Sequence, residues 1–235
     1  RWALWPGPLA AAPDDSCAYI FYSLIFAGSN GPWDFKSKGL SIAVWKDMKS
    51  RPERNCGLLF PAGDIQLGNA ALVENGMLYA YGCEPQGFSW PVKLGRAPFA
   101  QAQKRDAWEF YAGNGKWTRD AKSAAPVMDA APMLSVHWSK YLKRYVSFYS
   151  LPLRNKIALR TAPKPEGPWS TAIDAADCLP PLKSDNSGPG FCYSGLAHPE
   201  LAKDGGRIEY VSYYRETGFF KGEIRLLEIT LESIH

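Results

Sequence analysis

An aromatic strand pattern that recurs at long, regular intervals constrains the fold of this chain more than any other feature. The segments AYIFYSLIFAG, LYAYGCEP, YVSFYSLPL and EYVSYYRE each begin an alternating, aromatic-rich strand. Their anchor tyrosines lie 60, 66 and 65 residues apart: Tyr19, Tyr79, Tyr145 and Tyr210. Alternation with a period of two predicts β-strands, and recurrence at this interval predicts a repeat architecture.

Each anchored strand lies between two further segments with strand character. A small-residue strand and a tight turn precede it, as in GNAALV followed by ENG, and another patterned strand follows it. These following strands are predicted at residues 40–45, 91–98, 156–163 and 222–229. A unit of about four antiparallel strands at this spacing is typical of a propeller blade.

The sequence therefore predicts an all-β chain that folds as a β-propeller, either five-bladed or a four-unit portion of one. We assign residues 1–235 to a single propeller domain, with units anchored near residues 19, 79, 145 and 210. A β-sandwich is the structural alternative, but it leaves the repeated three-strand unit unexplained. Residues 99–111 are the only helix candidate, and we expect a loop excursion followed by a strand there.

Composition excludes several kinds of partner. The 27 Lys and Arg residues are scattered among 23 Asp and Glu, so the net charge of +4 forms no long basic stripe. Nucleic acid is therefore not an expected partner. The longest apolar run, residues 18–28, is too short to span a membrane, so no membrane span is expected. The oligomeric state stays open.

The repeat also sorts the acidic residues by position. In a propeller the first strand of each blade lines the central channel, and the upstream ends of these strands face a common pocket. Four acidic residues fall instead in the turn that follows the first strand, where Asp suits the backbone. We predict that these residues form turns: Asp14, Asp15, Glu74 and Asp204.

Polar residues at the predicted upstream ends are candidates for substrate binding. Asn69, His137 and His198 each lie six residues before a turn residue, so the repeat predicts one shared level in the channel. Polar groups along an otherwise apolar strand need a water, a ligand or a metal. We expect these three residues, together with Tyr193, to contact a sugar, with a hydrogen-bonded water network as the alternative.

Asp64, Asp129 and Glu200 are the candidate catalytic carboxylates, because repeat geometry places them at the same end of their units. Glycoside hydrolysis needs two such groups: one protonates the leaving oxygen, and the other activates water or attacks the sugar. Strand-end carboxylates in water are the alternative interpretation. The 9 Trp and 12 Tyr also suit stacking on sugar rings, although most of them are expected in the blade cores.

Other chemistries lack their motifs. The chain contains no GxSxG, HExxH, GxGxxG or P-loop sequence, and three scattered His residues predict no metal site and no cofactor. Cys178 and Cys192 enclose a loop rich in Pro, Gly and Ser. In an exported protein a disulfide would close this loop, and buried free thiols are the alternative.

A longer set of motifs resembles one bacterial family. These motifs are LGNAALVENGMLYAYGCE, VKLGRAPF, AWEFYAGNGKW, SVHWSKYLKRYVSFYS, IALRTAPKPEGPWS and GLAHPEL, in this order. The family was first catalogued as a domain of unknown function with a five-bladed β-propeller fold, and some members are endo-D-arabinanases, which are glycoside hydrolases. The resemblance covers residues 18–230. It implies a central carbohydrate-facing pocket, a polysaccharide or oligosaccharide partner, and a secreted or cell-surface location.

Comparison with the family pattern also shows one difference, at the N-terminus. Its members carry a further N-terminal stretch with acidic residues ahead of the segment that begins here at Arg1. We therefore expect that residues 1–235 lack an N-terminal part of the propeller. Three functions remain open: a glycoside hydrolase acting on arabinan-like polysaccharide, a non-catalytic carbohydrate-binding or surface-assembly propeller, and a protein-interaction propeller.

Overall fold

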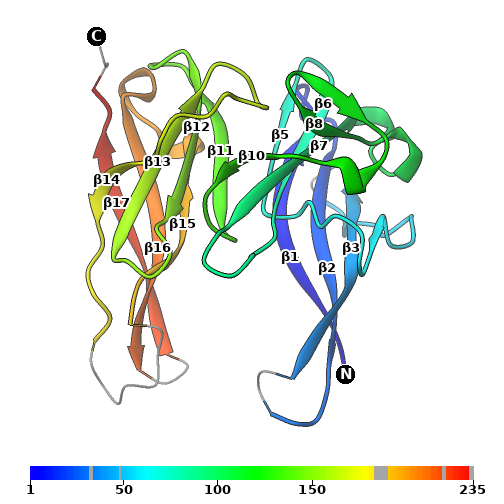
Figure 1. Cartoon of the computed structure of the whole chain (residues 1–235), viewed down its shortest axis with the longest axis horizontal. Helices are drawn as coiled ribbons and strands as arrows, with labels where there is room; N and C mark the ends of the chain where they lie inside the picture. The colour runs from blue at the N-terminus through cyan, green and yellow to red at the C-terminus, as the bar shows by residue number, and fades with distance from the viewer. Residues whose placement is uncertain (32–33, 48, 183–189, 219–220, 233–235) are drawn as a thin grey trace. The chain divides into compact units, whose positions relative to one another are not determined.

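The computed structural model describes residues 1–31, 34–47, 49–182, 190–218 and 221–232, and most of these form β-strands (Figure 1). Helical structure in these ranges consists of short 3-10 segments, and none of them has the length and apolar character to cross a membrane. The chain divides into two compact units. Unit 1 contains Arg1–Gln86 and Val92–Val127, and unit 2 contains Gly87–Pro91 and Met128–His235.

Unit 1 contains two antiparallel sheets. The first has the order β1 (Trp2–Ala11), β2 (Ala18–Ala27), β3 (Phe35–Trp45) and β4 (Phe60–Pro61). The second has the order β5 (Ala70–Glu74), β6 (Met77–Cys83), β7 (Pro91–Pro98), β8 (Glu109–Gly113) and β9 (Lys116–Thr118). A short strand, β10 (Pro126–Asp129), also pairs with β7.

Unit 2 repeats the arrangement. Its first sheet has the order β11 (Leu134–Ser139), β12 (Arg144–Ser150), β13 (Lys156–Ala162) and β14 (Ile173–Asp177). Its second sheet has the order β15 (Tyr193–Ala197), β16 (Ile208–Gly218) and β17 (Lys221–Thr230). Neighbouring strands in both sheets are antiparallel.

The repeat predicted from the tyrosine spacing is present. Each anchor tyrosine lies in the second strand of a different sheet, and not in the two stacked sheets that a sandwich requires. The four predicted following strands coincide with β3, β7, β13 and β17. Residues 99–111 form two 3-10 turns, η1 (Phe99–Gln101) and η2 (Arg105–Ala107), and then β8, as expected. The described residues give four sheets, so the five blades implied by the resemblance are corrected to four, one for each aromatic repeat.

The turns between first and second strands share a backbone feature. Each contains a non-glycine residue in the left-handed region: Asp15 (φ 54°), Asn75 (φ 50°), Lys143 (φ 51°) and Asp204 (φ 51°). This confirms the predicted turn roles of Asp15 and Asp204. Asp14 accepts hydrogen bonds from the side chain and backbone of Ser16, which lower the pKa of its carboxyl group. Glu74 is the last residue of β5.

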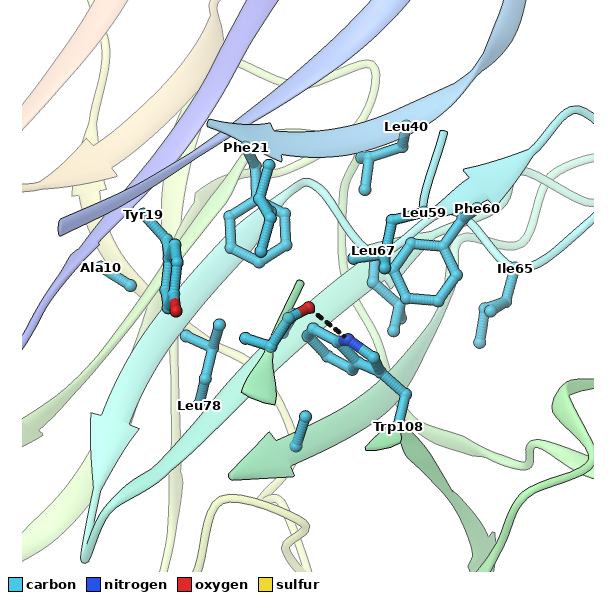
Figure 2. Close-up of a cluster of buried hydrophobic side chains, with 14 of the residues drawn as sticks. Ala10, Tyr19, Phe21, Leu40, Leu59, Phe60, Ile65, Leu67, Leu78 and Trp108 are labelled. Carbon is cyan, nitrogen blue, oxygen red and sulfur yellow. Dashed lines mark hydrogen bonds between the residues drawn. The ribbon is translucent and has the colours of Figure 1, made fainter. Parts of the chain in front are cut away.

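Aromatic side chains form the centre of the unit 1 core (Figure 2). Trp108 is fully buried, meets Phe60 edge to face at 5.3 Å between ring centroids, and donates from Nε1 to the Ala102 carbonyl at 2.8 Å. Phe21 from β2 and Leu67 from the segment before β5 belong to the same cluster. Both sheets of unit 1 therefore share one core, which satisfies the alternating pattern of each sheet.

A close contact between β15 and β12 organises unit 2. A Cβ atom added to Gly195 would lie 2.5 Å from the Ser150 backbone nitrogen, so only glycine allows this approach. The Ser135 hydroxyl on β11 accepts a hydrogen bond from the Ala197 nitrogen at 2.9 Å, which ties β15 to the neighbouring sheet. Phe148 and Tyr213 fill the core between the two sheets.

Cys178 and Cys192 are buried in this same core, although residues 183–189 of the loop between them lie outside the described residues. Asn155 holds both cysteines, since its carbonyl accepts from the Cys178 nitrogen at 2.9 Å and its Oδ1 from the Cys192 nitrogen at 2.8 Å. The thiols hydrogen-bond to each other, which lowers the pKa of Cys192 and raises that of Cys178. Both residues are present as buried thiols, which is the alternative to the disulfide expected for an exported protein.

We predict that oxidised glutathione converts the two thiols to a disulfide, with two glutathione thiols released. The bond closes a 15-residue loop, and loops of this length gain about 3 kcal/mol in free energy of unfolding. The free energy of unfolding measured in denaturant should be higher for the oxidised protein than for the reduced protein by about this amount. Cys178→Ala should abolish the difference, while Cys17→Ala keeps it. Quantitative alkylation of both thiols after oxidation would contradict the prediction.

The hairpin geometry gives a second prediction. Lys143 lies in the left-handed region, which costs a non-glycine residue about 1–2 kcal/mol. Lys143→Gly should therefore raise the free energy of unfolding by about 0.5–1 kcal/mol, even after the entropy lost by a more flexible unfolded chain. Lys140→Gly in the same turn relieves no strain and should lower the free energy of unfolding. Equal destabilisation in thermal unfolding of both variants would rule out the left-handed conformation at Lys143.

Candidate functional site

An aromatic-lined hollow lies at the upstream end of the unit 2 sheets. It has a volume of about 260 Å³, close to the lower limit of about 300 Å³ for small-molecule sites. Its wall is almost entirely apolar. The side chains that define this Tyr193 hollow belong to Trp90, Met133, Leu153, Phe191 and Tyr193. Tyr193 is 42% exposed, so part of this residue is accessible to a ligand.

The backbone around the hollow is strained. Leu153 and Ser194 line it, and both adopt positive φ angles, 61° and 60°. A bulky residue such as leucine is a rare occupant of this region, and such strain persists only where the surrounding structure enforces it. Strained residues of this kind cluster at ligand-binding sites, which supports a functional role for the hollow.

Asp129 lies beside the hollow. Its Oδ1 accepts a hydrogen bond from the backbone nitrogen of Trp90 at 2.5 Å, and its Oδ2 accepts from the Ser89 hydroxyl at 3.1 Å. The charge of Asp129 also contributes to the raised pKa of Tyr149, whose main cause is burial. These donors fix the direction of the carboxylate, which stays exposed to solvent. Of the three predicted catalytic residues, Asp129 is the one that adjoins the hollow.

A second carboxylate lies on β16, the strand that pairs with the strand of Tyr193. Tyr193 pairs with Tyr214 across the β15–β16 ladder, with ring centroids 4.7 Å apart. Glu216 lies two residues further along β16, on the same face as Tyr214. Burial raises the pKa of the Tyr193 phenol, and the charges of Tyr214 and Glu216 add to the shift. The Glu216 side chain is half-buried and makes no hydrogen bond within the part of the chain that is described.

His198 and Glu200 lie at the other end of β15. The strand ends at Ala197, and Glu200 belongs to the 3-10 turn η4 (Pro199–Leu201), on the hairpin side. His198 Nδ1 is 3.0 Å from Glu200 Oε1, and its Nε2 is 2.8 Å from Ser212 Oγ. The expected grouping with Tyr193 at the upstream end is therefore not what the structure shows, because Pro199 ends the strand and starts a turn.

His137 forms a separate buried pair. Its Nε2 is 3.1 Å from Oε1 of Glu209, which is 1% exposed. His137 Nδ1 and Glu209 Oε2 have no hydrogen-bond partner among the described residues. Side chains alternate along a strand, so Glu209 and Ser212 project from opposite faces of β16. The imidazoles of His137 and His198 therefore lie on opposite sides of this sheet and share no pocket.

Asp64 and Asn69 belong to unit 1. Asp64 accepts two hydrogen bonds from Arg105 Nη2, at 2.9 and 3.3 Å, and one from its Nε at 3.1 Å. Asn69 precedes β5 and accepts from the Cys83 nitrogen at 2.8 Å through Oδ1. Both side chains therefore make structural contacts within their own unit.

Sequence reasoning missed Trp90, Glu216 and Glu209. Trp90 and Glu216 lie in segments whose relation to Tyr193 depends on strand register, which no local motif reveals. Glu209 had a visible signal, since a carboxylate at an inward position of an aromatic strand needs a buried partner. Across the described ranges, no three His, Cys, Asp or Glu side chains form a group that could bind a metal ion.

Solved structures with low sequence identity share the fold. A candidate hydrolase from Bacteroides ovatus superimposes with a TM-score of 0.66 and 16% identity, over 93% of this chain and 56% of that one. An α-L-arabinofuranosidase from Clostridium thermocellum gives a TM-score of 0.55 and 11% identity, over 95% of this chain and 68% of that one. The present chain thus spans little more than half of the Bacteroides protein. The likeness confirms the predicted β-propeller fold, here with four blades.

Sequence comparison identifies the family. No curated protein matches the chain. The domain of unknown function DUF4185 matches residues 41–215, which is most of the sequence and includes the anchor residues Tyr79, Tyr145 and Tyr210, while Tyr19 lies before the matched range. All of the motifs that carried the resemblance lie within the matched residues. The chain belongs to the DUF4185 family.

Proposed function

We propose that the chain is a carbohydrate-active β-propeller, and specifically a glycoside hydrolase that acts on an arabinan-like polysaccharide. The observation that carries the proposal is the Tyr193 hollow, where aromatic side chains and a strained backbone occur together. Asp129 is hydrogen-bonded to Trp90 in its wall, and Glu216 lies on the strand that pairs with the strand of Tyr193. Sugar rings have apolar faces that stack on aromatic side chains and hydroxyl groups that pair with carboxylates. An arabinofuranosidase with the same fold supports the choice of substrate class.

Asp129 and Glu216 are the carboxylates that we assign to the reaction. One must protonate the leaving oxygen, and the other must activate water or attack the sugar. Asp129 is oriented by Ser89 and Trp90 and suits the role of base or nucleophile. Glu216 is half-buried, without a hydrogen bond from described residues, and suits the role of acid.

The predicted acids Asp64 and Glu200 are less suited to this chemistry. Asp64 is held by three hydrogen bonds from Arg105, and Glu200 by its contact with His198. A carboxylate held by such a partner is not free to turn toward a substrate. This engagement of two predicted acids favours the second candidate function, a non-catalytic carbohydrate-binding propeller.

We also propose a secreted or cell-surface location. A polysaccharide substrate of this kind is found outside the cytoplasm, and an oxidising compartment would close the Cys178–Cys192 pair. The thiol contact described above supports this proposal.

Amide substitutions test the catalytic assignment. Asp129→Asn and Glu216→Gln keep the side-chain shape but can neither accept nor donate the proton, and general acid–base catalysis contributes about 10²- to 10⁴-fold. Each variant should lose arabinan hydrolysis by this order, measured as reducing-end release, while isothermal titration shows that oligosaccharide binding persists.

Asp204→Asn is the matched control, because asparagine tolerates the left-handed backbone at this turn as aspartate does. It should retain full activity. Full activity in both site variants would overturn the assignment of the carboxylates. Binding of arabinan by the unaltered chain without any cleavage would replace the hydrolase with the binding propeller.

A further inference from the structure

Unit 1 contains a charged cavity of about 490 Å³ that is separate from the Tyr193 hollow. Four cationic side chains line it: Lys93, Arg105, Arg119 and Lys122. Three carboxylates line it as well: Asp64, Glu84 and Asp120. Its formal charge is therefore positive by one, and its chemistry depends on which of these groups are already paired.

Each carboxylate in the cavity has its own donors. Asp64 accepts three hydrogen bonds from Arg105, and Glu84 pairs with Lys93 at 3.5 Å. Asp120 accepts from the Lys122 backbone nitrogen at 3.0 Å and from the Ser123 hydroxyl at 2.7 Å, and these bonds lower the pKa of its carboxyl group. Each of the three carboxylates therefore has at least one donor among the described residues.

The cavity keeps donors in excess. Arg105 donates from Nε and Nη2 to Asp64, which leaves Nη1 without an acceptor among the described residues. Its guanidinium also lies over the rings of Phe60, at 5.1 Å, and Phe110, at 4.8 Å, so its position is fixed. In the described part of the chain, the side chains of Arg119 and Lys122 have no acceptor at all.

A cavity with free cationic donors, whose carboxylates already have donors of their own, is complementary to an oxyanion, since charge-assisted hydrogen bonds to such groups are short and strong. We propose that this cavity binds the oxyanion group of an acidic saccharide, a carboxylate or a phosphate ester. Arg119 and Lys122 provide the free charges, and Arg105 provides a rigid donor. The saccharide part of this inference rests on the proposed function, whereas the oxyanion part does not.

Calorimetric titration with a galacturonate trimer and with inorganic phosphate tests the site, and a neutral arabinose trimer serves as the uncharged probe. The double variant Arg119→Gln/Lys122→Gln should weaken binding of both anionic probes about tenfold or more, because a hydrogen bond to a charged group contributes about 1.5–3 kcal/mol. Binding of the neutral trimer should not change. Thermal unfolding checks that the double variant is folded.

Lys49→Gln/Arg51→Gln is the matched control, because it removes the same charges from exposed residues of unit 1 outside the cavity. It should leave anion binding intact. Equal loss of anion binding in both double variants would assign the binding to net charge and overturn the site. Absence of anion binding in the unaltered chain would also overturn it. Binding of phosphate but not of the galacturonate trimer would overturn the carboxylate form of the ligand and support the phosphate ester. Arabinan cleavage is measured separately, so failure of either proposal is distinguishable from failure of the other.

Discussion

The close approach of β15 to β12 at Gly195 determines the geometry of unit 2. Because no Cβ fits between Gly195 and the backbone of Tyr149 and Ser150, the two strands meet at a distance that only glycine permits. This contact brings the segment that carries Cys192 and Tyr193 against the loop that follows β12, and the Tyr193 hollow forms where they meet. Asn155 fixes the same segment through the Cys192 nitrogen. Leu153 and Ser194, which line the hollow, both adopt positive φ angles.

The chemistry of each unit follows from which carboxylates are free. In unit 1, Asp64 is occupied by Arg105, so the cavity around it presents cations. In unit 2, Glu209 is buried against His137, and Glu200 is held by His198. Asp129 and Glu216 differ from these because neither faces a cationic partner among the described residues. Within the described ranges, cations without an acceptor in unit 1 thus underlie the proposed oxyanion site, and carboxylates without a cationic partner in unit 2 underlie the proposed hydrolase site.

Much of the fold was predictable from the sequence because its causes are local. Period-two alternation gave the strands, and turn residues such as Asp15 and Asp204 marked the hairpins, where both adopt positive φ angles. The site was less predictable. Asn69, His137 and His198 share a six-residue offset from a turn, yet they lie before, inside and after their first strands. The turns differ in length, so counting back from the turn does not preserve strand position. The relation of Glu216 to Tyr193 depends on the strand register that pairs Tyr193 with Tyr214, which no local motif reveals.

A crystal structure of the chain with a bound arabino-oligosaccharide tests the central claim most directly. The account predicts a sugar ring in the Tyr193 hollow, stacked on Tyr193 or Trp90, with its glycosidic oxygen within hydrogen-bond distance of the Asp129 or Glu216 carboxylate. Clear density for the oligosaccharide elsewhere on the chain, with the hollow filled only by solvent, would contradict it.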